Sequence, residues 1–324
     1  MGLLGTVLPL VGGLALFLFG MNLMAQGLER RAGDRMKALL GRLTANRFLG
    51  LLLGAGATAL VQSSSAVAVM TVGFVNAGLM TLRQSVGVIM GANIGTTFTS
   101  WLLSLTQIKG GGFLLELVKP SGFTPILSAL GVVWYLFSKN EKKRDTGLIF
   151  LGFAVLITGM NTMTDAVKPL AELEGFQRIF LAFSNPLLGV LTGAILTAIL
   201  QSSSASVGIL QALSATGGVT VAAAIPLVMG QNIGTCVTSL LSSVGAEKNA
   251  KRAAMVHLYF NLLGTLILLV PYLLLPRLSV GGFWSNPVTA FDIALIHTGF
   301  NLLVTLILFP LAGLLERLAA LSVR

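Results

Sequence analysis

Charged residues are scarce in this sequence. Asp, Glu, Lys and Arg make up 10% of its 324 residues, whereas soluble domains carry about 25%. Hydrophobic residues make up 55%, and the mean hydropathy is +0.89. A helix needs about 20 apolar residues to cross a bilayer core of about 30 Å. Several runs approach or exceed that length, which predicts a polytopic α-helical membrane protein: Gly2 to Leu28, Phe123 to Ser138, Gly147 to Val167, Ala253 to Leu275 and Ile293 to Leu315.

Residues that carry redox, metal or acid–base chemistry are also scarce. Cys236 is the one cysteine, so an intramolecular disulfide is excluded, and its place in an apolar run is typical of a packing residue. No Asp or Glu lies deep in the apolar segments, which argues against a divalent-metal cage. The histidines are paired with carboxylates in no visible motif. We therefore expect no enzyme, no catalytic residues and no cofactor.

The net charge of +10 lies mainly in short loops between the apolar runs. On a soluble protein such a charge would suggest nucleic acid as a partner. In a membrane protein the positions of Lys and Arg indicate topology instead, because loops rich in these residues stay in the cytoplasm. We expect a lipid bilayer as a partner and no nucleic acid.

An internal repeat divides the chain. Three motifs recur with a constant spacing of 139 residues: Gly20-Met21-Asn22 as Gly159-Met160-Asn161, Gln62-Ser63-Ser64-Ser65 as Gln201-Ser202-Ser203-Ser204, and Asn93-Ile94-Gly95-Thr96 as Asn232-Ile233-Gly234-Thr235. A constant spacing is the mark of a duplicated unit. The sequence predicts a first repeat over 1–138, a second over 147–275 and an extra C-terminal span in 276–324. A shorter echo relates His257 and Asn261 to His297 and Asn301, 40 residues later, and we interpret it as a packing motif.

Equivalent loops of the two repeats carry opposite charge bias. The segment from Glu29 to Arg47 holds six basic and two acidic residues, whereas Lys168 and Arg178 face three acidic residues in the equivalent loop. Such a reversal predicts that the copies insert upside down relative to each other. The predicted topology places the N-terminus outside the cytoplasm and the C-terminus inside it. Its spans lie near 3–27, 84–105, 121–138, 147–167, 219–243, 253–275 and 291–315, and its hairpins near 48–80 and 184–217. The stretch from Glu29 to Arg47 is either an amphipathic interfacial helix or a solvated basic loop.

Each Gln-Ser-Ser-Ser motif separates two short apolar arms, which predicts a re-entrant hairpin with a polar tip. Irregular backbone at membrane depth is tolerated only where it lines a cavity or is buried in protein. The second arm starts at the tip, and a helix N-terminus suits an anion. Inverted symmetry would bring both tips to one central site. The alternative is that the serines and glutamine only join helices by hydrogen bonds.

The Asn-Ile-Gly-Thr segments lie within apolar spans. Gly and its polar neighbours, Thr97 among them, could unwind the helix and expose oxygen ligands of the kind that alkali cations take. The alternative is a close helix contact at the glycine. Asn22, Asn161 and Thr97 are candidates for cavity lining, and helix capping is the alternative for the two asparagines. His257 and His297 are expected to be buried hydrogen-bonding residues.

These paired motifs resemble those of the type II sodium-dependent phosphate cotransporter family. The resemblance covers nearly the whole chain, which looks most like a bacterial member. It implies an all-α polytopic fold with two inverted-topology repeats, each with a re-entrant helical hairpin and a discontinuous helix. It implies sodium-coupled symport of inorganic phosphate across the bacterial inner membrane, and a possible homodimer. By analogy Ser63, Ser64, Ser65, Ser202, Ser203 and Ser204 would bind phosphate. Gln62, Gln201, Asn93, Thr96, Asn232 and Thr235 would hold sodium or shape the site.

Other readings stay open at this point. The same architecture could carry another oxyanion or a carboxylate. A channel is a further possibility, although two closed hairpins that oppose each other favour alternating access, in which one part rocks or slides against the other.

Overall fold

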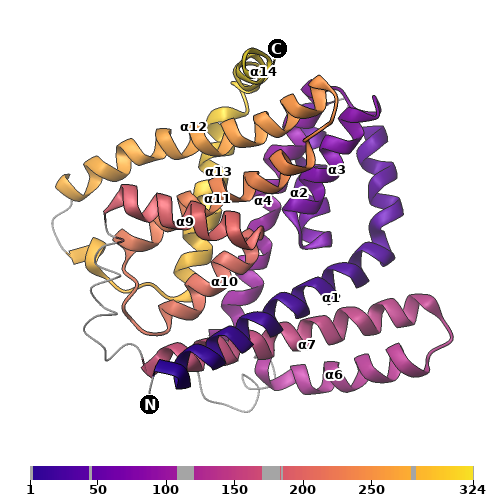
Figure 1. Ribbon diagram of the computed structural model, residues 1–324, viewed down its shortest axis with the longest axis vertical. Coiled ribbons are helices and arrows are strands. Elements are labelled where there is room, and N and C mark those ends of the chain that lie inside the picture. Colours follow the sequence, from indigo (N-terminus) through magenta and orange to yellow (C-terminus); the bar gives the residue numbers. More distant parts are fainter. Residues whose placement is uncertain are drawn as a thin grey trace.

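The computed structural model describes residues 3–43, 46–107, 120–169, 183, 185–278 and 282–323, and it is built from helices (Figure 1). The helices of the first half are α1 (Leu3–Leu43), α2 (Arg47–Val61), α3 (Ser64–Asn76), α4 (Leu82–Ser104), the short η1 (Leu105–Gln107) and α6 (Pro120–Phe137). Those of the second half are α7 (Glu141–Val167), α9 (Pro186–Leu200), α10 (Ser203–Ser214), α11 (Val221–Ser242), α12 (Lys248–Leu278), η3 (Gly282–Ser285), α13 (Ala290–Leu308) and α14 (Ala312–Ser322). Within these ranges the only β pairing is one isolated bridge, between Thr220 and Pro287.

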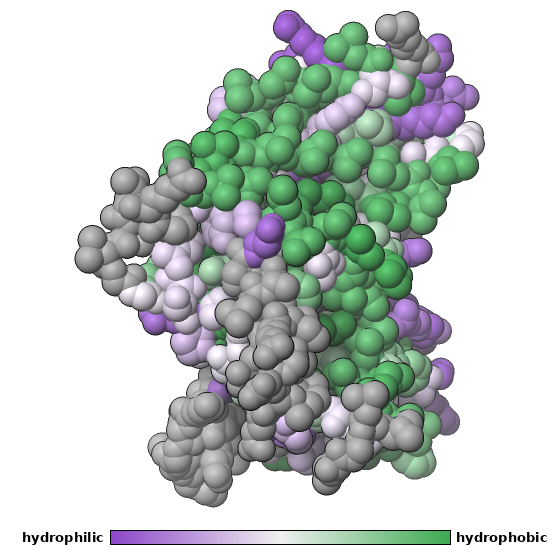
Figure 2. Space-filling model, turned by 60° about the vertical axis from the view of Figure 1, so that its left-hand side comes forward, coloured by the Kyte–Doolittle hydropathy of each residue, from purple (hydrophilic) through white to green (hydrophobic). Residues whose placement is uncertain are grey.

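In the part of the chain that the structure describes, six helices are long and apolar enough to cross a membrane: Gly5–Arg31, Leu82–Gln107, Glu141–Val167, Val221–Ser242, Lys248–Leu274 and Ala290–Leu308. Four further apolar helices are shorter, and three of them are α2, α3 and α9. The fourth, Gly122–Phe137, falls where the sequence predicted a span. Apolar side chains cover much of the described surface in Figure 2, and the polar ones gather mainly toward its ends. The prediction of an all-helical membrane protein is therefore confirmed.

Helices α1 and α7 pack closely along their glycines. A Cβ built on Gly13 would lie 3.0 Å from the Gly159 oxygen, and one built on Gly20 would lie 2.7 Å from the Gly152 oxygen. Position numbers rise along α1 while they fall along α7, so the two helices run antiparallel. The contact is also reciprocal, because Gly152 and Gly159 are the counterparts of Gly13 and Gly20 at the 139-residue spacing. Small residues permit this approach of two backbones.

The same kind of contact joins the first arm of each helix pair to the long helix that follows. A Cβ on Gly54 or Gly91 would collide with backbone across the α2–α4 contact, and one on the counterparts Gly193 or Gly230 would collide across the α9–α11 contact. The glycines of the Asn-Ile-Gly-Thr segments belong to these contacts, since Gly95 faces Ala55 and Gly234 faces Ala194. These glycines therefore make close helix contacts.

The predicted unwinding at the Asn-Ile-Gly-Thr segments is wrong, because α4 and α11 are continuous helices. The Asn93 amide donates to the Ile89 carbonyl at 2.8 Å, and the Thr96 hydroxyl donates to the Ala92 carbonyl at 3.1 Å. The counterparts Asn232 and Thr235 donate to Val228 and Gln231 at 2.8 and 2.9 Å. Each polar side chain thus donates to its own helix one turn earlier, and the helix stays continuous through both segments.

Two boundaries also differ from the prediction. Helix α1 continues to Leu43, so the solvated-loop interpretation of the segment from Glu29 to Arg47 is wrong up to that residue. The predicted span over 291–315 ends at Leu308, and α14 begins a separate helix at Ala312. Pro310 lies in the break, where its missing N–H and its ring would interrupt a helix. The loop over 170–182, used for the charge comparison, lies outside the described residues.

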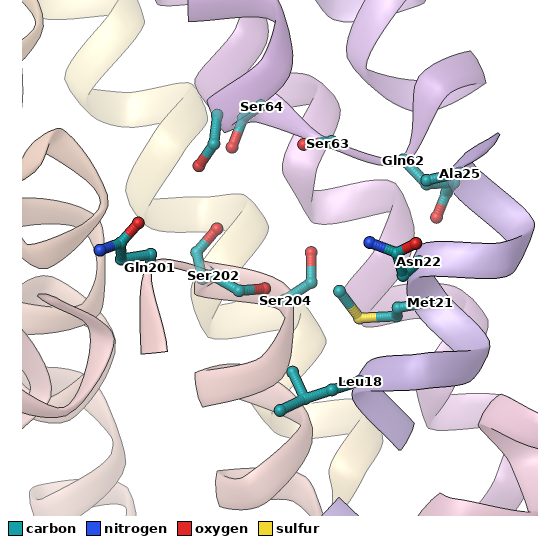
Figure 3. A pocket seen from close by; sticks show the side chains of 12 residues that line it. Leu18, Met21, Asn22, Ala25, Gln62, Ser63, Ser64, Gln201, Ser202 and Ser204 are labelled. Carbon is teal, nitrogen blue, oxygen red and sulfur yellow. The ribbon is translucent and has the colours of Figure 1, made fainter. Parts of the chain in front are cut away.

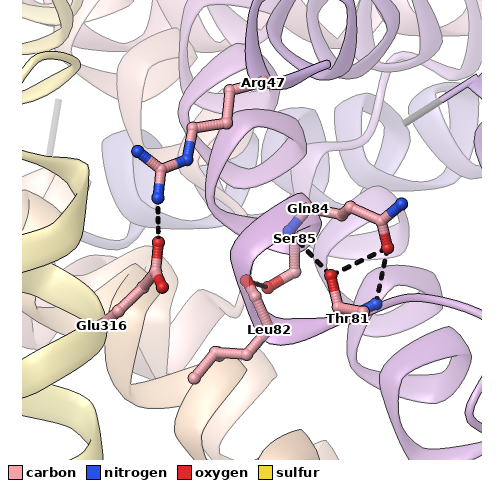
Figure 4. Close-up of polar contacts among 6 residues, drawn as sticks. All are labelled: Arg47, Thr81, Leu82, Gln84, Ser85 and Glu316. Atoms are coloured by element: carbon pink, nitrogen blue, oxygen red, sulfur yellow. Dashed lines mark hydrogen bonds and ion pairs between the residues drawn. The ribbon is translucent and has the colours of Figure 1, made fainter. Parts of the chain in front are cut away.

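The C-terminal helices fill two equivalent places. Helix α12 packs along α11, and α13 packs along α4. By sequence position the counterpart of α12 would be α6, yet α6 packs on α7 at the other end of the molecule (Figure 1). Helix α14 packs on α12 and reaches the start of α2 through an ion pair between Arg47 and Glu316 (Figure 4). The extra span therefore completes the surroundings of the first repeat.

Glycine packing between α1 and α7 gives a direct test of the fold. We expect Gly20→Ala to lower the free energy of unfolding by about 1–3 kcal/mol, because the new methyl group collides with the α7 backbone. Gly12→Ala is the matched control on the same helix, since a Cβ there meets nothing within 4 Å. Thermal unfolding of the purified protein in detergent measures both variants. Equal unfolding midpoints for the two would contradict the packing described here.

Candidate functional site

The two Gln-Ser-Ser-Ser segments line one pocket. We call residues 62–65 the first tip and residues 201–204 the second tip. The pocket has a volume of about 300 Å³, and its third wall is one face of α1, with Leu18, Met21, Asn22 and Ala25. Figure 3 shows the serines of the two tips facing each other across the space, with Asn22 at its side. Segments 139 residues apart in the sequence therefore form a single site.

Each tip is a tight helix–turn–helix break with an unusual backbone. Gln62 and Gln201 end α2 and α9 in the left-handed region, with φ of 58° and 53°. Among the described residues they are the only non-glycine residues with positive φ. Their backbone N–H groups close the preceding helix on the Thr58 and Thr197 carbonyls at 2.7 and 2.8 Å. A left-handed non-glycine residue costs about 1–2 kcal/mol, and such residues cluster at functional sites.

The next residue at each tip caps the helix that begins there. The Ser63 hydroxyl accepts from the Ala66 N–H at 3.1 Å, and the Ser202 hydroxyl accepts from the Ala205 N–H at 3.2 Å. One cap satisfies one of the four backbone N–H groups that lack a partner within a helix N-terminus. The N-termini of α3 and α10 thus both reach the pocket with donors to spare.

The electrostatics of the pocket come from backbone and neutral side chains. Among the described residues, the twelve that line the pocket carry no charge. A helix N-terminus carries about half a positive charge, and two of them border the same space. Serine hydroxyls add donors that can rotate toward a ligand. This arrangement suits a small anion.

The two tips are not in the same environment. The Gln62 side chain is 7% exposed, and its Oε1 accepts from the Thr99 hydroxyl at 3.0 Å. Gln201 is exposed, and Thr238, the counterpart of Thr99, donates to the Thr235 carbonyl at 2.9 Å. One tip is therefore bonded to the long helix beside it, and the other presents its glutamine to the open space.

The structure separates the predicted site residues into two groups. The eight tip residues and Asn22 line the pocket. Asn93, Thr96, Asn232 and Thr235 are buried in α4 and α11 and do not line it, and neither do Thr97 and Asn161. The Thr97 hydroxyl donates to the Ile94 carbonyl at 2.8 Å, and Asn161 is partly exposed on α7.

Sequence reasoning missed the wall that α1 contributes. Leu18, Met21 and Ala25 surround Asn22 at spacings of three and four residues, which place side chains on one face of a helix. With Asn22 as a candidate for cavity lining, this helical spacing would have predicted that the three neighbouring residues line the same cavity. Thr99 was also missed, because its bond to Gln62 joins positions 37 residues apart.

Both histidines lie away from the pocket and are buried and hydrogen bonded. His297 Nδ1 is 2.7 Å from the Ser100 hydroxyl, and His257 Nδ1 is 2.9 Å from the Ser239 hydroxyl. In the described part of the chain no three His, Cys, Asp or Glu side chains come together as metal ligands would.

Comparison with known proteins identifies the family of the chain. The model of the Na+/Pi-cotransporter family matches the chain twice, over residues 16–165 and 156–275. The protein named "Putative inorganic phosphate export protein YjbB" from Escherichia coli K12 is 30% identical over 82% of this chain and 46% of its own length. The chain thus spans about half the length of that relative.

Two further relatives differ in coverage. "Uncharacterized protein YqeW" from Bacillus subtilis is 30% identical over 95% of both chains. Human "Sodium-dependent phosphate transport protein 2B" is 34% identical over 45% of this chain and 23% of its own. No solved structure matches the chain. With the family model covering most of the sequence, the chain belongs to the Na+/Pi-cotransporter family.

Proposed function

We propose that this chain moves inorganic phosphate across a membrane together with sodium ions, by alternating access to the pocket between the two tips. The observation that carries the proposal is the pocket itself, in which two helix N-termini border an uncharged space of about 300 Å³. The family and the relatives named for phosphate transport support the choice of substrate. Ser63, Ser64, Ser65 and their counterparts Ser202, Ser203 and Ser204 would bind phosphate, with Asn22 beside them.

Phosphate binding here would require cations. A phosphate dianion is costly to remove from water, and the described residues that line the pocket include no Lys or Arg to offset that cost. Helix N-termini supply part of the positive potential, and bound sodium would supply the rest. Affinity for phosphate would then depend on sodium, which is what coupling requires. Each inward Na+ gains about 2.3 kcal/mol per 100 mV and about 1.4 kcal/mol per tenfold gradient.

Sodium would bind where neutral oxygens gather close to the tips. The C-terminal ends of α2 and α9 carry carbonyl groups without intrahelical partners, and Gln62 and Gln201 lie there. The polar residues of the adjacent helices, Asn93, Thr96, Asn232 and Thr235, are the other proposed ligands. Their present bonds to their own helices mean that they would bind an ion through their remaining oxygen acceptors.

We also propose that the two halves are inverted repeats and that the helix pairs are re-entrant hairpins. The antiparallel, reciprocal glycine contact between α1 and α7 is what two copies inserted in opposite directions would produce. The two matches of the family model support a duplication. Helices α2, α3 and α9 are short for a span, which fits hairpins that stop near the membrane centre. The N-terminus would lie outside and the C-terminus inside a bacterial inner membrane, with a homodimer as the proposed assembly.

Phosphate export is the second candidate for the direction of transport. It is favoured by the Escherichia coli relative, whose name is that of a putative inorganic phosphate export protein. A pocket that reaches both sides in turn can run either way, since the gradients decide the net flux. Transport of another oxyanion or a carboxylate also fits the neutral donors, and competition against labelled phosphate would separate these substrates.

Serines that line the pocket should control phosphate affinity. We expect the double variant Ser64→Ala, Ser203→Ala to raise the phosphate KM about tenfold, the equivalent of 1.4 kcal/mol of lost donors. Uptake of labelled phosphate into proteoliposomes measures it. Ser128→Ala is the control, because this exposed serine donates to its own helix on α6. An unchanged KM in the double variant would remove the tips from the binding site.

Sodium coupling has a separate test. Phosphate uptake should rise at least tenfold when an inward Na+ gradient replaces a choline gradient at equal ionic strength. Vesicles preloaded with phosphate test export under the reversed gradient. Equal flux in Na+ and choline would refute coupling while leaving phosphate transport intact.

The unequal tips provide a test of alternation. In the opposite-facing state we expect Gln201 to bond Thr238 and Gln62 to be free, because inverted repeats exchange conformations. Thr99→Val should then depopulate the observed state, and Thr238→Val should enrich it. Ala25→Cys, in a background with Cys236→Ala, places a thiol in the pocket wall for labelling by an impermeant reagent. The two variants should shift the labelling rate in opposite directions, whereas parallel shifts would contradict the exchange.

A further inference from the structure

The echo between α12 and α13 forms two buried polar contacts that the phosphate pocket does not use. His257, Asn261 and Thr265 lie one turn apart on α12, and His297, Asn301 and Thr305 repeat this pattern on α13. All six side chains are at least 94% buried. Positions four residues apart share one helix face, so each helix presents a polar row. We call the α11–α12 and α4–α13 contacts the two polar seams.

Equivalent serines pair with the two rows. Ser239 on α11 bonds His257, and Ser100 on α4 bonds His297. These serines are counterparts at the 139-residue spacing. In the α11–α12 seam a second contact follows, where the Asn261 amide lies 3.3 Å from Cys236 Sγ. Tyr272 of α12 donates to the Ala222 carbonyl at 2.8 Å, so α11 and α12 run antiparallel.

The third level of each seam contains the Asn-Ile-Gly-Thr asparagines. With a rise of about 1.5 Å per residue, the antiparallel register places Asn232 level with Thr265. In the other seam, Phe309 near the end of α13 packs against Phe48, which lies beside the N-terminal part of α4. His297, earlier on α13, contacts Ser100 near the C-terminal end of α4. Helices α4 and α13 are therefore antiparallel too, and Asn93 is level with Thr305.

Oxygen atoms at these levels lack partners. Asn261 Oδ1, Thr265 Oγ1, Asn301 Oδ1 and Thr305 Oγ1 are buried without a hydrogen bond. The amide nitrogens of the four seam asparagines are already used, since Asn261 and Asn301 donate to the His257 and His297 carbonyls at 3.1 and 2.9 Å, and Asn93 and Asn232 donate within their own helices. The asparagine oxygens that remain are acceptors only, whereas the threonine hydroxyls can donate or accept, and a buried polar group without a partner is unfavourable.

We propose that each seam binds one monovalent cation, of which sodium is the physiological one, through Asn261 and Thr265 with Asn232, and through Asn301 and Thr305 with Asn93. A cation can be bound by amide and hydroxyl oxygens at the same time through their lone pairs, whereas a water molecule in the same place would give the protein no dependence on Na+. Neutral amide and hydroxyl oxygens are hard ligands. The absence of a carboxylate from these six residues favours a single positive charge over a divalent ion.

The role of these ions in transport rests on the sodium coupling proposed above. The position of the ions rests only on the buried oxygen atoms of the seams. Asn93 and Asn232 lie on the helices that pack on α2 and α9, the arms that end at the tips. An ion in a seam would hold each long helix against its C-terminal partner. This extends the proposed sodium ligands to four residues on α12 and α13.

Valine replacements test the seams directly. The full-length protein in detergent, without phosphate, is titrated with NaCl against choline chloride at constant ionic strength, and the thermal unfolding midpoint is followed. We expect Na+ to raise the midpoint of the wild type. The double variant Thr265→Val, Thr305→Val should need about tenfold more Na+ for half of the effect, the loss of about one ligand contact per site. Serine at the same positions keeps the hydroxyl and should keep the Na+ response.

Thr71→Val is the matched control, because this fully buried threonine donates to the Val67 carbonyl at 2.7 Å. An unchanged half-saturating Na+ concentration in the double valine variant would overturn the proposal, and so would a wild-type midpoint that Na+ does not move. Uptake assays separate the two ideas. Sodium-dependent uptake that the valines leave unaltered refutes the seam sites and leaves symport standing. If uptake does not depend on sodium but the valines still weaken the effect of Na+ on the unfolding midpoint, symport is refuted and the seam sites stand.

Discussion

The cost of unpaired polar groups in an apolar surrounding governs this molecule. A chain with 10% charged residues has few charges with which to bind a charged ligand. Helix ends can supply the potential instead, because an interrupted helix exposes N–H groups on one side of the break and C=O groups on the other. Each tip is such a break, held by a glutamine in the left-handed region and a serine cap. The broken ends are tolerated where they line a cavity, and the pocket is that cavity.

Close packing through glycine determines where these breaks lie. The α2–α4 and α9–α11 contacts leave no room for a Cβ at several positions, so each first arm is fixed against a long helix. The α1–α7 contact is equally close and brings the pocket wall of α1 against the other half. Any side chain added at these contacts would displace backbone, and the tips would move with it. Glycine is abundant, at 38 residues, and these contacts show what some of them do.

The sequence alone predicted that the two tips meet, but it did not predict the polar contacts of the two seams. The constant 139-residue spacing was enough to predict that Ser63–Ser65 and Ser202–Ser204 face one another, because symmetry does not depend on knowing each contact. Unwinding at Asn93 and Asn232 was predicted from composition, and it failed because their amides bond back to their own helices. The pairing of His297 with Ser100 joins residues 197 positions apart. No local pattern contains that information, so the echo was interpreted as packing.

A partial asymmetry between two nearly equivalent halves is what the alternating access proposed above requires. If both tips had the same environment, the pocket would be equally closed or open toward each side, and no step would distinguish one side from the other. Gln62 is bonded to Thr99 while Gln201 is free, although both have the same backbone conformation. The difference therefore lies in side-chain bonds, which exchange at little cost, and the strained turns are common to both. Under the alternating access proposed above, the molecule would reverse its asymmetry without refolding either tip.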